Sequence, residues 1–480
     1  MEVKRSGLIA SLMLVMFLAA IEGTIVTLAT PVIVRDLQGF EHISLVFSVY
    51  LLTSAISTPI YGKLADLYGR KKILSLGILI FLVGSFLCGL SYSMVMLIIC
   101  RAVQGLGAGA IITVSYTIIG DVFTWEERSK IQGALSTVWG IAALAGPFVG
   151  GFLIDMLSWH WIFFINIPFG LLAVFLLHRS LDEITAAEKQ PIDYVGAFTL
   201  SVAMLALLSI FLFNQERETG GYVLTMLLSA LTVLCLAAFY RVEKKAQEPV
   251  MPFSIFTKSS VLVNLISFLV FAVLMGADVY LALYLQNVQG YRPLVAGLAL
   301  LPMSISWLIA AFLLGKLLVK FGGKMVTSVS LMLLLVCTFL LTTLHPASPL
   351  PVVLLYIFLI GFAFGGASTA LTIIIQDSVG YGQRGAAMGV NSLLRTLGQT
   401  IGISIFGSIF NSSITDYLIK QGISGVNASN LYQSAVSAKQ IVLAINSSMH
   451  VLFIAFAVIS ALALAVAVLM PKVTGPEYKE

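Results

Sequence analysis

Long apolar stretches recur along the whole chain and constrain its fold more than any other feature of the sequence. About 20 helical residues cross the hydrocarbon core of a bilayer, and a helix satisfies its own backbone hydrogen bonds, which lipid cannot do. The sequence therefore predicts an all-α integral membrane protein with about fourteen transmembrane helices. These lie near residues 8–31, 43–62, 73–92, 94–119, 131–155, 161–179, 194–213, 222–240, 260–287, 294–318, 325–344, 350–376, 386–411 and 448–470.

The composition agrees with a chain surrounded by lipid. Hydrophobic residues make up 59% of the 480 positions and charged residues only 10%, against about 25% charged residues in soluble proteins. This is too little charge to cover the polar surfaces of soluble domains. The first apolar stretch is longer than the core of a signal peptide, so we expect it to be a spanning helix.

Lys and Arg residues are unevenly divided between the predicted loops. If alternate loops lie on opposite sides, 20 of the 27 belong to one side, together with both termini, and 5 to the other. Cytoplasmic loops carry an excess of positive charge, so we expect both termini in the cytoplasm. The net charge of +5 is scattered over many loops, and no nucleic-acid partner is expected.

Enzyme chemistry finds little support. The sequence has no phosphate-binding loop, no nucleophile elbow and no residues with metal-ligand spacing, and its four cysteines lie in apolar stretches as small packing residues. No loop is long enough for a nucleotide-binding domain. We expect a protein that is not an enzyme, holds no cofactor or metal, and takes its energy from an ion gradient or a partner.

A weak internal repeat indicates two related bundles. Gly62-Lys-Leu-Ala-Asp-Leu-Tyr-Gly-Arg-Lys follows the second predicted span, and Gly315-Lys-Leu-Leu-Val-Lys-Phe-Gly-Gly-Lys follows the tenth. Secondary transporters are commonly built from repeated bundles with the substrate site between them. Val319 stands where the first copy has Asp66, so we expect the first copy to carry the regulatory charge.

Four motifs in order resemble those of one family, and the resemblance covers essentially the whole chain. The loop that begins at Gly62 resembles the loop signature of the major facilitator superfamily, and Arg101-Ala-Val-Gln-Gly-Leu-Gly-Ala-Gly resembles its fourth-helix motif. Ala145-Gly-Pro-Phe-Val-Gly-Gly resembles the fifth-helix motif of its proton-coupled antiporters. Trp159-His-Trp-Ile-Phe-Phe-Ile-Asn-Ile-Pro is similar to a segment of its fourteen-helix drug:proton antiporters.

The resemblance implies a domain organisation. We expect an N-terminal six-helix bundle at residues 1–190, two inserted transmembrane helices at 191–240, and a C-terminal six-helix bundle at 241–480. Residues 412–447 are rich in Ser, Asn and Gln and are expected to form an extracellular loop. Within it, 431–445 has some helical periodicity, and a hairpin, a surface helix and a plain linker all remain open.

The resemblance also implies a function, namely export of lipophilic, often cationic drugs in exchange for protons. We expect a monomer in a bacterial plasma membrane, with protons, small lipophilic molecules and lipid as its partners. A metabolite exporter and a sodium or potassium:proton antiporter remain alternatives. A membrane receptor or lipid-handling protein, and a membrane-embedded enzyme, represent other classes.

Ionisable residues deep in predicted spans are the main candidates for the site, because such residues are expensive and usually functional. Glu22, in the family pattern acid-x-Thr-Ile-Val, and Arg101 lie at similar depth and can meet inside the N-terminal bundle. Glu22 is predicted to exchange protons or attract a cationic substrate; the alternative is a structural ion pair. Asp278 is the corresponding candidate in the C-terminal bundle, or else a partly hydrated acid near the outer mouth.

The loop motif predicts a conformational latch. Gly62 and Gly69 permit a tight turn, and Asp66 can face the positive N-terminal end of a helix in the other bundle. Arg70 can pair with Asp121. Alternatively, Arg70 and the two lysines after it only set the topology.

Two further motifs suggest moving parts. In the family, the glycine-proline helix acts as a bending or sealing element of exporters, here with Ala142 in place of one glycine; its residues are Gly146, Pro147, Gly150 and Gly151. The segment from Asn391 to Gly398, in the thirteenth predicted span, also matches the family, and its Asn391 and Arg395 suggest interbundle packing or gating. Aromatic and Met side chains can line a greasy pocket or face lipid; these are Tyr50, Met275, Tyr280 and Tyr284.

Overall fold

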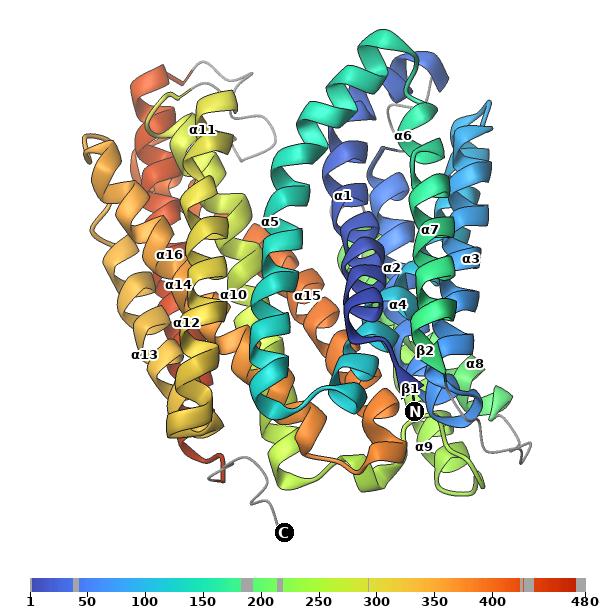
Figure 1. Ribbon diagram of the computed structural model, residues 1–480. Coiled ribbons are helices and arrows are strands. Elements are labelled where there is room, and N and C mark those ends of the chain that lie inside the picture. The colour runs from blue at the N-terminus through green and yellow to red at the C-terminus, as the bar shows by residue number, and fades with distance from the viewer. Residues whose placement is uncertain are drawn as a thin grey trace. The chain divides into compact units, whose positions relative to one another are not determined.

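The computed structural model describes residues 2–37, 43–182, 193–213, 219–291, 293–423, 426 and 436–471. These residues are almost entirely helical (Figure 1). Twelve helical segments among them are long and apolar enough to span a membrane, so the all-α membrane fold is confirmed. The count of fourteen is not, because α5 (Trp125–Met156) and α8 (Tyr194–Phe213), which match two predicted spans, are not among the twelve.

The chain divides into two compact units. Unit 1 comprises Met1–Ser260 with Ile375–Leu393, and unit 2 comprises Val261–Ile374 with Leu394–Glu480. Both boundaries in the second half fall inside helices, α14 (Leu350–Asp377) and α15 (Arg384–Lys420). The last turn of α14 and the first turns of α15 therefore belong to unit 1. The predicted division into two bundles and an inserted pair stays a prediction.

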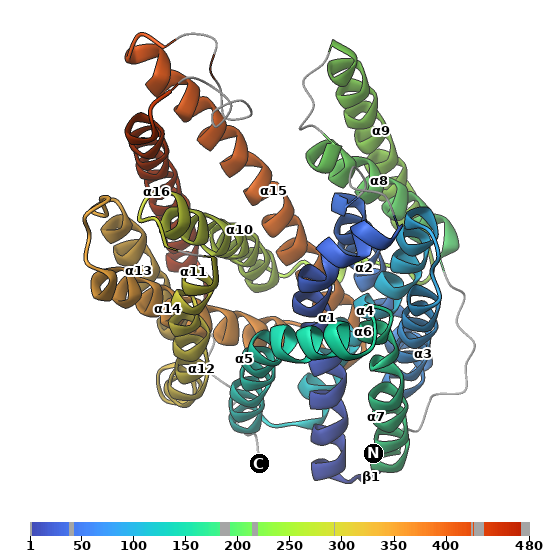
Figure 2. The same ribbon diagram turned by 90° about the horizontal axis from the view of Figure 1, so that it is seen from above.

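Unit 1 is built from the helices of the first half of the chain. Besides α5 and α8, its described residues form six long helices and the single turn α6 (Trp161–Phe164). The six are α1 (Arg5–Leu37), α2 (Ile43–Tyr68), α3 (Arg70–Gly89), α4 (Met94–Val122), α7 (Asn166–Ser180) and α9 (Thr219–Glu243). Helices α2 and α3 pack on α4, and α5 and α7 pack on α1. Helices α8 and α9 pack on each other, and α8 lies against α2 (Figure 2).

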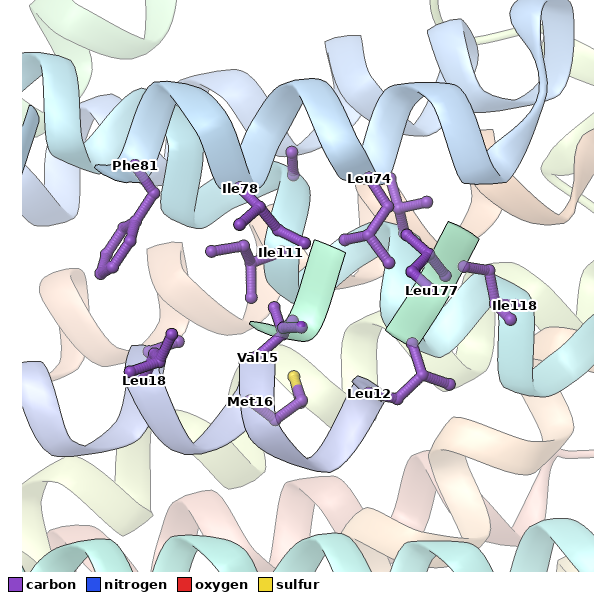
Figure 3. Close-up of a cluster of buried hydrophobic side chains, with 14 of the residues drawn as sticks. Leu12, Val15, Met16, Leu18, Leu74, Ile78, Phe81, Ile111, Ile118 and Leu177 are labelled. Atoms are coloured by element: carbon purple, nitrogen blue, oxygen red, sulfur yellow. The ribbon is translucent and has the colours of Figure 1, made fainter. Parts of the chain in front are cut away.

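The core of unit 1 combines apolar side chains with close backbone contact. Leu12, Val15 and Met16 of α1 face Ile78 of α3 and Leu177 of α7 (Figure 3). Lipid offers helices no hydrophobic drive to associate, so membrane helices rely on tight packing of small residues. A Cβ on Gly107 of α4 would lie 2.6 Å from the carbonyl oxygen of Gly77 on α3. The glycines of the Arg101 motif thus bring α3 and α4 together.

The N-terminus is tied to the ends of two other helices. Strand β1 (Glu2–Val3) pairs antiparallel with β2 (Leu181–Asp182), and Arg5 forms a 2.5 Å ion pair with Glu127 at the start of α5. Hydrogen bonding from the Thr124 backbone amide, together with Arg5, holds the pKa of Glu127 below its ordinary value. The strand pair and the Arg5–Glu127 ion pair therefore fix the N-terminus to unit 1 outside the apolar part of the helices.

Unit 2 contains the remaining helices. They are α10 (Lys258–Asn287), α11 (Pro293–Ala299), α12 (Leu301–Phe321), α13 (Gly323–Leu341), α16 (Ala438–Val468) and most of α14 and α15; the short 3-10 turns η2 (Phe253–Ile255) and η3 (Tyr381–Gln383) belong to unit 1. Helix α13 packs on α16. The rings of Phe406 and Phe456 meet edge to face at 4.8 Å, close to the backbone of Gly276 on α10.

The internal repeat is visible in the backbone. Gly69 has φ 95° and Gly322 has φ 80°, and each directly precedes a helix, α3 and α13 respectively. Positive φ favours glycine because it has no Cβ. The two sequence copies therefore form the same turn, although only the first carries the Asp and Arg charges.

The polar segment 412–447 is shorter as a loop than predicted. Helix α15 continues to Lys420, and α16 begins at Ala438 after a capping box formed by Ser437 and Gln440. Polar side chains in this extension are satisfied within the helix, since Ser412 donates to the Ser408 carbonyl. The residues between, 424–425 and 427–435, lie outside the described residues, so the predicted hairpin or surface helix is tested only from residue 436 onward.

Candidate functional site

Glu22 and Arg101 form an ion pair in the interior of unit 1. Nη1 of Arg101 lies 2.5 Å from Oε1 of Glu22, and both side chains are 1% exposed. Nε of Arg101 donates to the Val46 carbonyl at 3.2 Å, and its guanidinium lies 4.2 Å from the centre of the Tyr50 ring. A pair this deep is stable only when both partners are also hydrogen-bonded, and the side chains of Gln104 and Asn166 provide such bonds.

Polar side chains surround the pair, those of Ser85, Gln104 and Asn166. Gln104 accepts from Nη1 of Arg101 at 2.7 Å and donates to Oγ of Ser85 at 2.7 Å. Asn166 donates to Oε2 of Glu22 at 2.9 Å and also to Oγ of Ser85 at 2.9 Å. We call this set the Glu22 network, with members Glu22, Ser85, Arg101, Gln104 and Asn166. It joins α1, α3, α4 and α7.

The motif that begins at Trp159 places Asn166 in this network. The helix is interrupted between Phe164 and Asn166. On one side of the break, Nε1 of Trp159 donates to Asp36 at the end of α1 at 2.8 Å, and Phe163 is fully buried. On the other side, α7 begins at Asn166, whose side chain is 1% exposed. The motif thus anchors the chain to α1 and delivers an amide to Glu22.

The glycine-proline helix makes close contact with α1 one turn from this network. Thr24 donates to the Ile21 carbonyl at 2.9 Å and to the Ala142 carbonyl at 3.3 Å. A Cβ on Gly146 would collide with the Thr24 hydroxyl. Helix α5 runs without a break past Pro147, and Gly150 is buried while Gly151 is partly exposed.

Asp278 of α10 has a different environment in unit 2. Its side chain is partly buried, and it has no hydrogen-bond or ion-pair partner among the described residues. Aromatic residues follow it on the same helix. The ring of Tyr280 meets that of Phe410 at 5.4 Å, and the Tyr284 hydroxyl donates to the His345 carbonyl at 2.8 Å.

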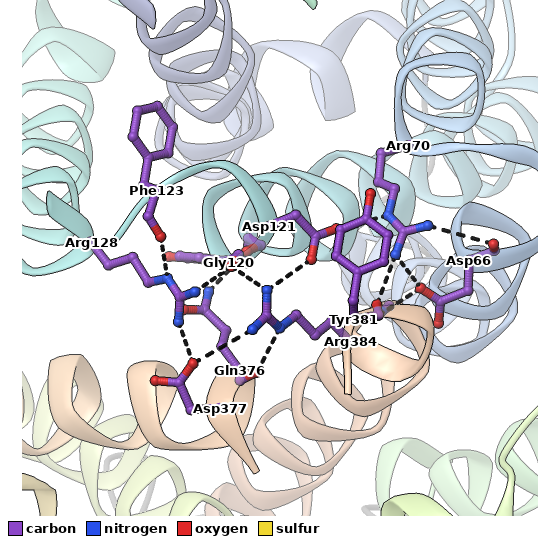
Figure 4. Close-up of polar contacts among 12 residues, drawn as sticks. Asp66, Arg70, Gly120, Asp121, Phe123, Arg128, Gln376, Asp377, Tyr381 and Arg384 are labelled. Carbon is purple, nitrogen blue, oxygen red and sulfur yellow. Dashed lines mark hydrogen bonds and ion pairs between the residues drawn. The ribbon is translucent and has the colours of Figure 1, made fainter. Parts of the chain in front are cut away.

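A second group of charges lies where the loop motif meets the start of α15. Asp66 accepts hydrogen bonds from the backbone amides of Gly385 and Ala386, at 3.1 and 2.9 Å. These amides belong to the first turn of α15, where the helix dipole favours a negative charge. Arg70 donates to Asp66 at 2.9 Å and to Asp121 at 2.8 Å (Figure 4). The predicted contacts of Asp66 and Arg70 are therefore present.

Three charged residues that we did not single out complete this group. Arg384 contacts Asp121 at 3.2 Å and donates to the Gly120 carbonyl at 2.6 Å. Arg128 pairs with Asp377 at 2.6 Å and also donates to the Gly120 carbonyl (Figure 4). We call the set Asp66, Arg70, Asp121, Arg128, Asp377 and Arg384 the charge cluster. The two arginines stabilise the partial negative charge at the C-terminal end of α4.

Glycine backbones pack closely beside the charge cluster. A Cβ added to Gly62 of α2 would collide with the Gly385 carbonyl, and one on Gly389 would lie 2.7 Å from the carbonyl oxygen of Thr58. Gly69 supplies the positive φ that turns the chain into α3. These glycines let α2 touch α15 without a side chain between them, so the Asp66 carboxylate reaches the α15 amides.

The remaining predicted residues lie inside the units. Asn391 is fully buried, and Arg395 donates to Thr372 at 2.8 Å with its guanidinium 4.9 Å from the Phe271 ring centre. Of the four proposed pocket residues, Tyr50, Tyr280 and Tyr284 are buried and Met275 is partly buried. None of the three tyrosines therefore faces lipid. Among the described residues, no three His, Cys, Asp or Glu side chains are placed to hold a metal ion.

Comparison with known proteins identifies the class. The model of the Major Facilitator Superfamily matches residues 12–403, so the chain belongs to this family. It is a multi-pass membrane transporter and not an enzyme.

The chain is also similar to individual proteins over most of its length. The chain is 34% identical to the multidrug transporter protein MdtP of Bacillus subtilis, over 87% of this chain and 78% of the relative. It is 33% identical to the multidrug efflux pump SdrM of Staphylococcus aureus, over 90% of this chain and 94% of the relative.

Solved structures share the fold at low sequence identity. The human organic anion transporter MFSD10 superposes with a TM-score of 0.67 at 14% identity, covering 97% of this chain and 99% of that one. The proton:xylose symporter XylE gives 0.66 at 14% identity, covering 98% and 96%.

Proposed function

We propose that the protein exports lipophilic, often cationic drugs in exchange for protons. The observation that supports this most strongly is a fully buried, hydrogen-bonded carboxylate and arginine pair in a chain whose relatives are named multidrug transporters. Because those two relatives are bacterial, the proposed location is the bacterial plasma membrane. The excess of Lys and Arg on one side favours cytoplasmic termini. We propose a monomer that needs no cofactor besides the proton gradient.

Glu22 is the proposed proton-coupling residue of unit 1. Its carboxylate is the counter-charge of Arg101, so taking up a proton weakens the ion pair and leaves the guanidinium to its neutral partners. A cationic drug also competes for the same negative charge. Proton and drug then stabilise different conformations, and this difference in affinity drives the cycle.

Asp278 is the proposed second acid. With no ion pair among the described residues, its charge is available to a proton or to a cationic substrate. Tyr280, two residues further along α10, and Phe410, whose ring meets it, offer aromatic faces that attract cations.

The charge cluster is the proposed conformational latch. Its acceptors and donors come from the α2–α3 turn, the end of α4, the start of α5 and the segment from Asp377 to Ala386. Binding of this segment to the loop motif would hold one access state, and its release would permit the other. The contact of Gly146 with α1 would seal or bend the helix pair during that change.

Dye transport tests this proposal. Inside-out vesicles are energised with an imposed pH gradient, and the uptake of ethidium is followed by its fluorescence. We expect gradient-dependent uptake by the wild type, collapse on adding a protonophore, and loss in Glu22→Gln and in Asp278→Asn at equal expression. Uptake that ignores the gradient would refute proton coupling, and full activity of both variants would refute these site assignments.

A further inference from the structure

Asn166 is the member of the Glu22 network whose role the proposed function leaves open. It lies at the break between α6 and α7 and is 1% exposed. One oxygen of Glu22 is occupied by Arg101, and the amide of Asn166 donates to the other. Asn166 is therefore the residue that contacts the oxygen not held by the arginine.

We propose that Asn166 is a positioning residue that sets how readily Glu22 takes up a proton. This inference rests on the proposed function, because it requires Glu22 to exchange protons during transport. A hydrogen bond donated to a charged carboxylate is stronger than one between neutral groups. The amide thus favours the charged form of Glu22, independently of Arg101.

The orientation of the amide supports this role. Both hydrogens of the Asn166 amide are used, one on Glu22 and one on Ser85, whereas its Oδ1 has no hydrogen-bond partner among the described residues. A proton on the facing oxygen of Glu22 would point at these amide hydrogens. A half turn of the amide would accept that proton but would leave both hydrogens without acceptors. Protonation of this oxygen therefore costs hydrogen bonds that Asn166 makes in the charged state.

The groups around Glu22 come from every helix packed against α1. Arg101 comes from α4, the Tyr50 ring from α2 stacks on the guanidinium, and Cys88 from α3 donates to Gln104. On the α5 side, Thr24 meets the backbone of Ala142 and Gly146, which carry no charge. Arg101 holds one oxygen of the carboxylate and Asn166 donates to the other, so the substitution of Asn166 removes one contribution and leaves the ion pair in place.

Equilibrium binding of ethidium to the purified full-length protein over a series of pH values tests the proposal. Protons compete with the dye for the carboxylate, so binding should rise with pH around a midpoint that reports proton uptake. Asn166→Leu and Asn166→Ser both remove the donor, the latter with a polar side chain too short to reach Glu22. We expect each to shift the midpoint upward by about one pH unit, which is a tenfold gain in proton affinity.

Two controls make the result specific. Asn264→Leu removes a buried amide from α10 in unit 2 and should leave the midpoint unchanged. These measurements use the Asp278→Asn background, so that Glu22 is the one proposed proton-binding acid left. There Glu22→Gln should abolish the pH dependence; if it keeps the midpoint, the assignment of Glu22 in the proposed function fails, and this inference with it. A wild-type midpoint in folded Asn166→Ser, when Glu22→Gln has lost the dependence, would overturn the role of Asn166 alone.

Discussion

The two units each hold a carboxylate within an apolar helix, but they surround it in opposite ways. In unit 1, Glu22 is paired with Arg101 and accepts a hydrogen bond from Asn166. In unit 2, Asp278 has no such partner among the described residues. Burying a charge is costly unless it is paired and hydrogen-bonded. Glu22 is therefore built into the structure, whereas Asp278 contributes little to it.

Because of this difference, a loss of activity has a different meaning at the two carboxylates. Replacing Glu22 or its partner disturbs a network that joins four helices, so loss of activity there can come from folding. Replacing Asp278 breaks no visible contact, so loss of activity there would point to a direct role. The following predictions test that contrast, from the largest expected effect on stability to the smallest.

Arg101→Met should destabilise the protein most. Removing one partner of a buried ion pair leaves an uncompensated charge and typically costs about 3–5 kcal/mol. Thermal unfolding in detergent measures the effect. The double variant Arg101→Met with Glu22→Gln should recover much of it, because no charge is then left alone. A single variant as stable as the wild type would remove the claim that the pair is structural.

Asp66→Asn should destabilise less but still stop transport. The carboxylate accepts from two backbone amides of α15 and from Arg70, and hydrogen bonds to a charged group contribute about 1.5–3 kcal/mol. Dye export at matched expression is the measurement. Glu126→Gln, at the exposed first turn of α5, serves as the control and should remain active. Unchanged export by Asp66→Asn would eliminate the latch.

Lys63→Met should have a small effect, although Lys63 also forms an ion pair. Its Nζ lies 2.7 Å from Glu248, and the two side chains are 11% and 28% exposed. Partly hydrated pairs contribute up to about 1 kcal/mol. A loss as large as that of Arg101→Met in the same unfolding assay would show that burial does not govern the ranking.

Asp278→Asn should be the mildest change for stability. The substitution is nearly isosteric and breaks no pair among the described residues, so we expect a shift below about 1 kcal/mol. Transport should nevertheless be lost. Destabilisation comparable with that of Arg101→Met would contradict the contrast between the units, because it would imply an ionic partner for Asp278.

The sequence was most informative where neighbours in the chain are neighbours in space. Hydropathy located the helices, and depth within two spans predicted that Glu22 and Arg101 meet. The pairing of Arg70 with Asp121 followed from the loop motif. The end of α15 was placed too early because hydropathy falls before the helix ends, and hydroxyl groups bond back to preceding carbonyls there.

Partners separated by long stretches of sequence escaped prediction. Arg128 and Arg384 were counted only as loop charges, although they meet Asp377 and the end of α4. No spacing rule links residues more than two hundred positions apart. Gln104 and Asn166 did carry a usable signal, since each is a polar side chain within an apolar motif, but their common partner depends on how α4 and α7 pack against α1.

Coupled flux in proteoliposomes tests the central claim most directly. Ethidium is loaded on one side with no pH gradient, and a trapped pH indicator reports proton movement while the dye runs down its gradient. Proton-coupled antiport predicts protons moving against the direction of the dye, in the wild type but not in Glu22→Gln or Asp278→Asn. Dye movement by the wild type without any proton movement would contradict the account.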